Sequence, residues 1–108
     1  MSENKQSVDC RRLKDRQDAY QPGDFCWEFD FTHFEHGAKP EDQRLTIYIC
    51  LPGNTRWHPL HVARGGTPTD SHTWGWDGNF DKPTLTPSIH EPGTWHGHLQ
   101  AGRLISCP

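Results

Sequence analysis

The sequence predicts a mainly β fold: a small antiparallel sheet, or two packed sheets, of about five to seven short strands behind a polar, flexible N-terminal arm. Two stretches, 25–32 and 43–50, alternate apolar and polar residues with the period of two that a half-buried strand requires. Asp77-Gly78 and Gln100-Ala101-Gly102 are turn sequences in which glycine readily takes a positive φ. No segment after residue 20 has the pattern of a long helix.

Composition indicates a small core that depends on aromatic side chains. Hydrophobic residues make up 31% of the 108 residues, and the five Trp, five Phe and two Tyr can each bury roughly 150–250 Å². The formal net charge of −3 argues against nucleic acid as a partner, because nucleic-acid binders usually carry a basic excess. No apolar run approaches the roughly 20 residues of a membrane span, and no signal-peptide core begins the chain. We therefore expect a cytoplasmic protein whose four cysteines are free thiols.

The domain organisation follows from a change of composition near residue 22. Residues 1–22 are polar and charge-dense, which predicts a mobile arm; an arm that becomes ordered on a partner is the alternative. The sequence Gln21-Pro22-Gly23-Asp24 predicts a turn at the boundary. A single β domain is then expected over residues 23–108.

The first predicted strand, residues 25–32, carries an aromatic face that is expected to lie in the core. That face consists of Phe25, Trp27, Phe29 and Phe31, and a ligand-stacking surface is the alternative. Residues 43–50 predict a second strand whose two faces are both fairly apolar, as in the interior of a sheet. Residues 57–63 predict a return strand. Because Pro59 cannot donate a hydrogen bond, that strand is expected at an edge or with a bulge.

The last third of the chain predicts short strands interrupted by prolines. Trp74 and Trp76 share one strand face, and 96–99 with 103–105 predict a hairpin. Core packing is the favoured role of the two tryptophans, and stacking on a base or sugar is the alternative. If this region forms a ligand or partner surface instead, its residues are Trp74, Trp76, His96 and His98.

The cysteines and histidines do not have the spacing of a structural zinc site. No two cysteines lie two to four residues apart, and only His58/His61 and His96/His98 form close pairs. We therefore predict no cofactor and no tightly bound metal, and we regard zinc as the alternative. The weak candidate ligands, should a site exist, are Cys50, His61, His96 and Cys107.

Catalytic motifs are absent from the linear sequence. There is no Gly-x-Ser-x-Gly elbow, and Gly65-Gly66 lacks the Lys-Ser/Thr of a phosphate-binding loop. A thiolate–imidazole pair of Cys50 with His58 or His61 is a formal alternative that no local pattern supports. We therefore predict no catalytic residue.

The stretches WGWDGNFDKPTLTPSI and WHGHLQAGRL resemble an uncharacterised family of bacterial and phage proteins, some of which carry the unsupported label ammonia monooxygenase. The resemblance covers roughly residues 45–107. It implies a phage or prophage setting, and in many members a zinc site built on a cysteine-rich turn. Here that turn holds only Cys50, and Trp95 stands where relatives have cysteine. The shared features fall on Trp74, Trp76, Asp77, Gly78, Pro87, Ser88, Ile89, His96, Gly102, Arg103 and Leu104.

These observations together predict a non-enzymatic protein-interaction module that binds a host or phage protein by strand addition at an exposed sheet edge. The partner is unidentified, no membrane is involved, and a monomer or weak dimer in the host cytoplasm is expected. The alternative is a metal-dependent enzyme or zinc-binding domain that uses the His/Cys cluster.

Overall fold

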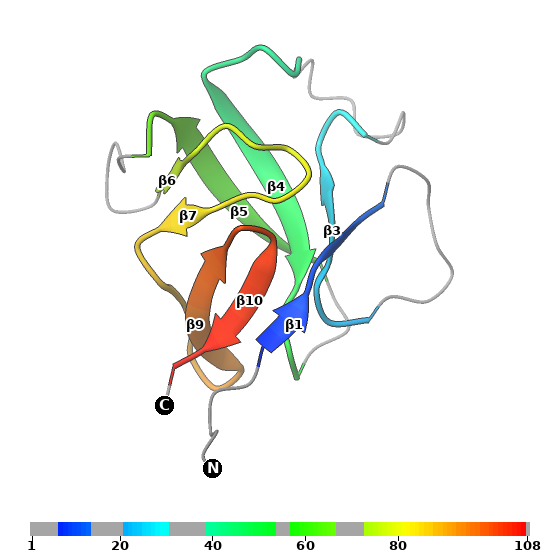
Figure 1. Ribbon diagram of the computed structural model, residues 1–108, viewed down its shortest axis with the longest axis vertical. Coiled ribbons are helices and arrows are strands. Elements are labelled where there is room, and N and C mark those ends of the chain that lie inside the picture. The colour runs from blue at the N-terminus through cyan, green and yellow to red at the C-terminus, as the bar shows by residue number, and fades with distance from the viewer. Residues whose placement is uncertain (1–6, 14–20, 31–38, 54–56, 67–72, 108) are drawn as a thin grey trace.

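A computed structural model describes residues 7–13, 21–30, 39–53, 57–66 and 73–107. Ten short strands form two sheets, and these residues contain no helix (Figure 1). The predicted mainly β fold is therefore confirmed. It follows that no helix in the described residues could cross a membrane.

The four-stranded sheet contains the C-terminal strands, in the order β1-β10-β9-β8, and all its pairs are antiparallel. The six-stranded sheet has the order β2-β3-β4-β5-β6-β7, with parallel pairs at β2–β3 and β5–β6. The first sheet comprises β1 (Ser7–Asp9), β8 (Ile89–Glu91), β9 (Trp95–Gln100) and β10 (Arg103–Ser106). The second comprises β2 (Arg11–Arg12), β3 (Asp24–Trp27), β4 (Arg44–Cys50), β5 (Trp57–Arg64), β6 (Trp74–Trp76) and β7 (Leu85–Thr86).

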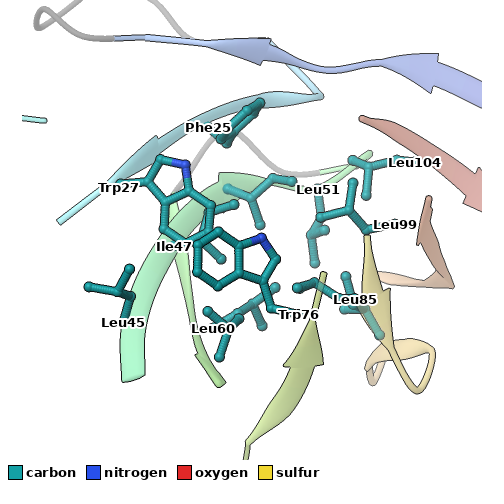
Figure 2. Close-up of a cluster of buried hydrophobic side chains, with 13 residues drawn as sticks. Phe25, Trp27, Leu45, Ile47, Leu51, Leu60, Trp76, Leu85, Leu99 and Leu104 are labelled. Atoms are coloured by element: carbon teal, nitrogen blue, oxygen red, sulfur yellow. The ribbon is translucent and has the colours of Figure 1, made fainter. Parts of the chain in front are cut away.

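The core joins the facing sides of the two sheets. Trp27 and Trp76 lie at its centre with ring centroids 4.7 Å apart, and Leu99 and Leu104 reach it from the four-stranded sheet (Figure 2). Both tryptophans and Ile47 are fully buried, as their alternating patterns predicted. The chain has few aliphatic side chains, so aromatic side chains supply much of its buried apolar area.

Strand β3 is shorter than its alternating pattern predicted. It ends at Trp27 because Asp30 closes a turn: the Asp30 carboxylate accepts the Trp27 N–H at 2.8 Å, and the Asp30 N–H donates to the Trp27 carbonyl. Phe29 is therefore only half-buried, stacked against Trp27 at 6.3 Å, and Phe31 lies outside the described residues. Cys26, on the other side of the strand, is also buried, against Leu13.

Strand β5 pairs along its whole length with β4, whereas β6 pairs only with Val62–Arg64. Pro59 therefore lies in the half of β5 that β6 does not reach, opposite Tyr48 of β4. The expectation of an edge position holds for this half of the strand, although β5 as a whole lies inside the sheet. Proline has no backbone N–H to donate, and this is tolerated at position 59 because β6 does not pair with this half of β5.

The β9–β10 hairpin has the glycine turn that its sequence predicted. The two turn residues, Ala101 and Gly102, have φ values of 48° and 75°. Two successive positive φ values match the right-handed twist of the flanking strands. A side chain at position 102 would also approach Lys82 to 3.0 Å, so both conformation and space require glycine.

Residues 7–13, predicted as part of a polar arm, add a strand to each sheet. Strand β1 pairs with β10, β2 pairs with β3, and Leu13 is buried (Figure 1). Backbone pairing at a sheet edge needs no apolar side chains, which explains how so polar a segment is placed. The mobility of residues 1–22 as a unit and the domain boundary at residue 23 remain predictions.

Candidate functional site

A serine and a histidine form a hydrogen-bonded pair at the junction of the two sheets. Ser88 lies between β7 and β8, and His96 lies on β9. Ser88 Oγ is 3.2 Å from His96 Nε2. Ser88 is half-buried and His96 is exposed, so the pair is accessible from solvent. A hydroxyl within hydrogen-bonding reach of an imidazole is the geometry of an activated nucleophile.

The pairing of β8 with β9 brings these two side chains to the same face. His90 lies directly opposite His96, and Ile89 lies opposite Gly97. Because strand residues alternate between faces, Ser88, His90 and His96 share the outer face, while Ile89 points into the core and is 2% exposed. A turn closed by the Thr94 N–H and the Glu91 carbonyl, at 2.9 Å, joins the two strands.

Trp74 connects Ser88 to the six-stranded sheet. Its indole Nε1–H donates to the Ser88 carbonyl at 3.3 Å. Strand β7, which precedes Ser88, is an edge of the six-stranded sheet, and β8, which follows it, is an edge of the four-stranded sheet. The position of Ser88 therefore depends on how the two sheets are held together.

The absence of a side chain at Gly97 lets the Ile105 backbone and the Trp95 ring pack closely against β9 next to His96. A Cβ atom at this position would collide with the Ile105 carbonyl oxygen and with the Trp95 ring. The Trp95 ring covers Gly97, and its Nε1–H donates to Ser106 Oγ at 2.8 Å. The strand segment that carries His96 is thus packed on its inner side, while the imidazole itself is exposed.

The four weak metal candidates are not gathered into one site. Cys50 is fully buried at the end of β4, and His61 on β5 lies 3.1 Å from Thr46 Oγ1. Only His96 and Cys107 are neighbours, because the Cys107 N–H donates to the His96 carbonyl at 2.9 Å. Within the described ranges, no three His, Cys, Asp or Glu residues come together as metal ligands.

The Cys50 thiol, the other side chain considered as a nucleophile, is protonated and does not pair with His58 or His61. Burial raises the pKa of its thiol to about 11, so the thiol stays protonated at neutral pH. His58 faces Glu91, with Nδ1 3.5 Å from the carboxylate, and His61 faces Thr46. His61 instead lines a cavity of about 300 Å³ with Glu28, whose carboxylate accepts the Thr46 N–H at 2.6 Å.

The residues expected at a ligand or partner surface separate into three environments. Trp76 belongs to the core and is fully buried. Trp74 is half-buried and supports Ser88, whereas His96 and His98 are exposed on the outer face of the four-stranded sheet. The parts of this set that remain on the surface therefore lie around the Ser88–His96 pair.

Comparison with known protein families gives a match over residues 18–107, to the family described as bacterial ubiquitination-like system serine protease (BubE). The chain belongs to the BubE family. The match corrects the prediction of a non-enzymatic interaction module, because this family is one of enzymes, and it does not support the metal-dependent alternative. It agrees with a bacterial family and with protein partners, and it carries no sign of phage origin. No curated protein and no solved structure matches the chain.

Sequence reasoning missed the Ser88–His96 pair. The sequence indicated Ser88 only as part of a shared Pro-Ser-Ile segment, and it indicated His96 as a weak metal candidate, a shared family residue and a member of a possible ligand or partner surface, but not as a general base. A Gly-x-Ser-x-Gly elbow between a strand and a helix, the motif that would have indicated a nucleophilic serine, does not occur in this sequence. The available signal was a serine just before one strand of a hairpin and a histidine on the other, eight residues later in the sequence.

Proposed function

We propose that this BubE-family chain is a serine protease that cleaves an acyl bond in protein substrates, with Ser88 as the nucleophile and His96 as the general base. The contact of 3.2 Å between Ser88 Oγ and His96 Nε2 carries the proposal. The family match, which names a serine protease, supports it independently. The substrates are proteins of the bacterial ubiquitination-like system that the family description names.

The proposed reaction follows from the chemistry of the pair. A serine hydroxyl is a weak nucleophile until an adjacent base takes its proton. The neutral His96 ring would carry its proton on Nδ1, leaving Nε2 free to accept the proton of Ser88. Ser88 Oγ then bonds to the substrate carbonyl carbon, and His96 passes the proton to the leaving group as its bond breaks. Water then gives a proton to the same imidazole as its oxygen bonds to the acyl carbon, and His96 returns that proton to Ser88 Oγ as the bond between Oγ and the acyl carbon breaks.

The direct test uses a fluorophosphonate, which phosphonylates activated serines with loss of fluoride. Intact-mass and peptide analysis of the treated wild-type chain should find one adduct on Ser88. Ser88→Ala should remove the adduct. His96→Ala should slow its formation by roughly 10²–10⁴-fold, the usual contribution of a general base.

The matched control is His98→Ala, because His98 is exposed on the same strand and the same face as His96. This variant should label at the wild-type rate and retain the wild-type melting temperature. An unlabelled Ser88 in the folded wild-type chain, or equal labelling of wild type and His96→Ala, would contradict the proposal.

We also propose that the reaction needs no metal ion, because the Ser88–His96 pair itself supplies both nucleophile and base. Treatment with a chelator should leave both the melting temperature and the rate of Ser88 labelling unchanged. Loss of either, with restoration by added zinc, would contradict this prediction. The first ligands to replace would then be His96 and Cys107, since these two of the four weak candidates lie side by side.

A further inference from the structure

We propose that His90 is a positioning residue for His96, whose ring it holds in the orientation that faces Ser88. The inference rests on the proposed function of the Ser88–His96 pair. His90 and His96 are direct cross-strand partners on β8 and β9. Their ring centroids are 4.7 Å apart and their planes are inclined by 40°. No other ring contact is recorded for His96 in the described part of the chain.

The strand register makes this contact close. The Cys107 N–H donates to the His96 carbonyl, so the backbone polar groups of His96 face β10 and not β8. His90 and His96 are therefore a non-hydrogen-bonded pair of the β8–β9 ladder, the kind in which opposite side chains come closest. The His90 ring restricts the orientations open to His96 and keeps Nε2 directed at Ser88.

In many serine hydrolases a carboxylate orients the catalytic histidine and stabilises the imidazolium that forms. Within the described residues, no carboxylate is recorded in a hydrogen bond or ion pair with His96. Glu91, the nearest in sequence, points to the opposite face of β8, where it lies 3.5 Å from His58. His90 is the group in contact with the imidazole that must become charged.

His90 acts on His96 through the contact between the two rings. A ring at position 90 leaves the His96 imidazole fewer orientations than a small side chain would, and this effect depends on the presence of a ring and not on its nitrogen atoms. A phenyl ring at position 90 should therefore replace the His90 imidazole, whereas a methyl group should not.

Other polar side chains lie near this pair in the described residues. On the same outer face lie Ser88, just before β8, and His98 of β9, with Cys107 across from His96. Farther along the sheet, Arg103 of β10 is paired with Asp9 of β1 at 3.1 Å. Of these neighbours, Ser88 forms the hydrogen bond to the His96 ring, and His90 forms the ring contact.

The test measures the rate of Ser88 phosphonylation by a fluorophosphonate at pH 8. His90→Phe retains a ring at position 90, so it should label Ser88 at close to the wild-type rate. His90→Ala should be about ten- to a hundredfold slower at pH 8, since it leaves His96 less well oriented.

The control is again His98→Ala, which should keep the wild-type rate. All these positions are exposed, so melting temperatures should not change, and any loss of rate is not a loss of fold. If wild-type Ser88 is labelled and His90→Ala keeps the wild-type rate, or His90→Phe is as slow as His90→Ala, the positioning role of His90 is overturned while the proposed function stands. If wild-type Ser88 is not labelled, the proposed function fails and this inference fails with it.

Discussion

At the scale of single residues, Trp27 shows how a buried aromatic side chain contributes both packing and a hydrogen bond. It is fully buried, lies 4.7 Å from Trp76 and 5.4 Å from Phe80 between ring centroids, and donates its Nε1–H to the Phe80 carbonyl at 3.0 Å. It therefore connects β3 to the loop that follows β6.

Replacing Trp27 by alanine should lower the free energy of unfolding by roughly 3–5 kcal/mol, because the cavity adds to the lost transfer energy. That is a large part of the roughly 5–15 kcal/mol of a typical domain, so the variant should be partly unfolded. Trp27→Phe keeps most of the apolar contact and should lose less. Urea denaturation followed by circular dichroism measures both, and a loss below about 1 kcal/mol for the alanine variant would contradict the burial.

Three cysteines should make the stability of the protein depend on pH in the alkaline range. Burial raises the pKa of Cys10 and Cys26 to about 12 and that of Cys50 to about 11. Between the ordinary value of 9.0 and these values, the unfolded thiols release protons that the folded thiols retain. The contribution of these three thiols to the free energy of unfolding should therefore be constant below about pH 9 and should fall as the pH rises toward 11–12.

Melting temperatures recorded from pH 7 to pH 11 should show this decline, and Cys26→Ala should make it shallower. Cys26 suits the test because it is buried against Leu13 and Tyr48 and plays no part in the proposed chemistry. Equal slopes for the variant and the wild type would show that the Cys26 thiol ionises as easily in the folded chain as in the unfolded one.

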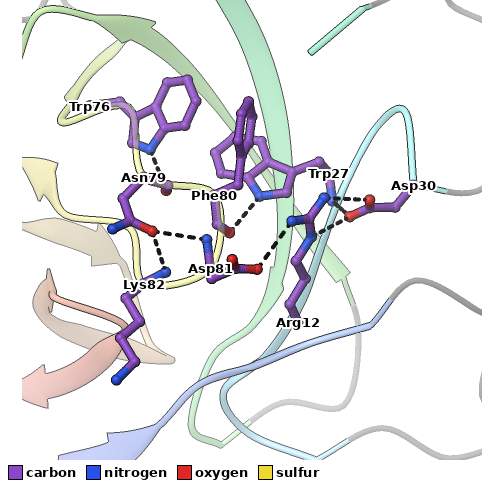
Figure 3. Close-up of polar contacts among 8 residues, drawn as sticks. All are labelled: Arg12, Trp27, Asp30, Trp76, Asn79, Phe80, Asp81 and Lys82. Carbon is purple, nitrogen blue, oxygen red and sulfur yellow. Dashed lines mark hydrogen bonds and ion pairs between the residues drawn. The ribbon is translucent and has the colours of Figure 1, made fainter.

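At the scale of elements, the N-terminal segment shows how charged side chains fasten a polar strand. The Arg12 guanidinium lies between Asp30, at 2.8 Å, and Asp81, at 3.1 Å (Figure 3). It also lies over the rings of Phe29 and Phe80. The side chains of Arg12 and Asp30 are only 15% and 5% exposed. The pair is therefore largely removed from water, where loss of one partner leaves an uncompensated charge.

Arg12→Ala should destabilise the protein by roughly 3 kcal/mol, because Asp30 is left buried without its cation. The control is Arg103→Ala, because the side chains of Arg103 and its partner Asp9 are 54% and 87% exposed. Loss of this ion pair should lower the free energy of unfolding by less than about 1 kcal/mol. A chain starting at Gln21 should lose at least as much as Arg12→Ala, since it also lacks buried Leu13. Similar stabilities for all these chains in urea would show that residues 7–13 act as the separate arm first predicted.

At the scale of the whole molecule, the proposed site depends on the packing of two sheets. Ser88 lies between β7, the edge strand of one sheet, and β8, the edge strand of the other, and Trp74 of the six-stranded sheet donates to its carbonyl. His96 belongs to the four-stranded sheet. The position of Ser88 relative to His96 therefore depends on contacts with both sheets.

Trp74→Phe should slow the fluorophosphonate labelling of Ser88 by up to about tenfold, the equivalent of one hydrogen bond, while the fold is retained. Trp95→Phe is the matched control, because it also removes one indole hydrogen bond, to Ser106, from a half-buried tryptophan. It should leave the labelling rate nearly unchanged. Equal effects of the two substitutions would indicate that Trp74 acts through general stability and not through the position of Ser88.

Much of the β architecture could be predicted from the sequence alone, because strand alternation and glycine turns are local properties. The pattern of 43–50 predicted β4, and the glycine at position 102 predicted the last hairpin. Tertiary structure alone decided that β3 stops at Trp27, since the Asp30 turn competes with further pairing, and that a polar N-terminal segment closes two sheet edges. It also decided the candidate site: strand register brings Ser88, His90 and His96 onto one face, and register depends on packing between distant segments.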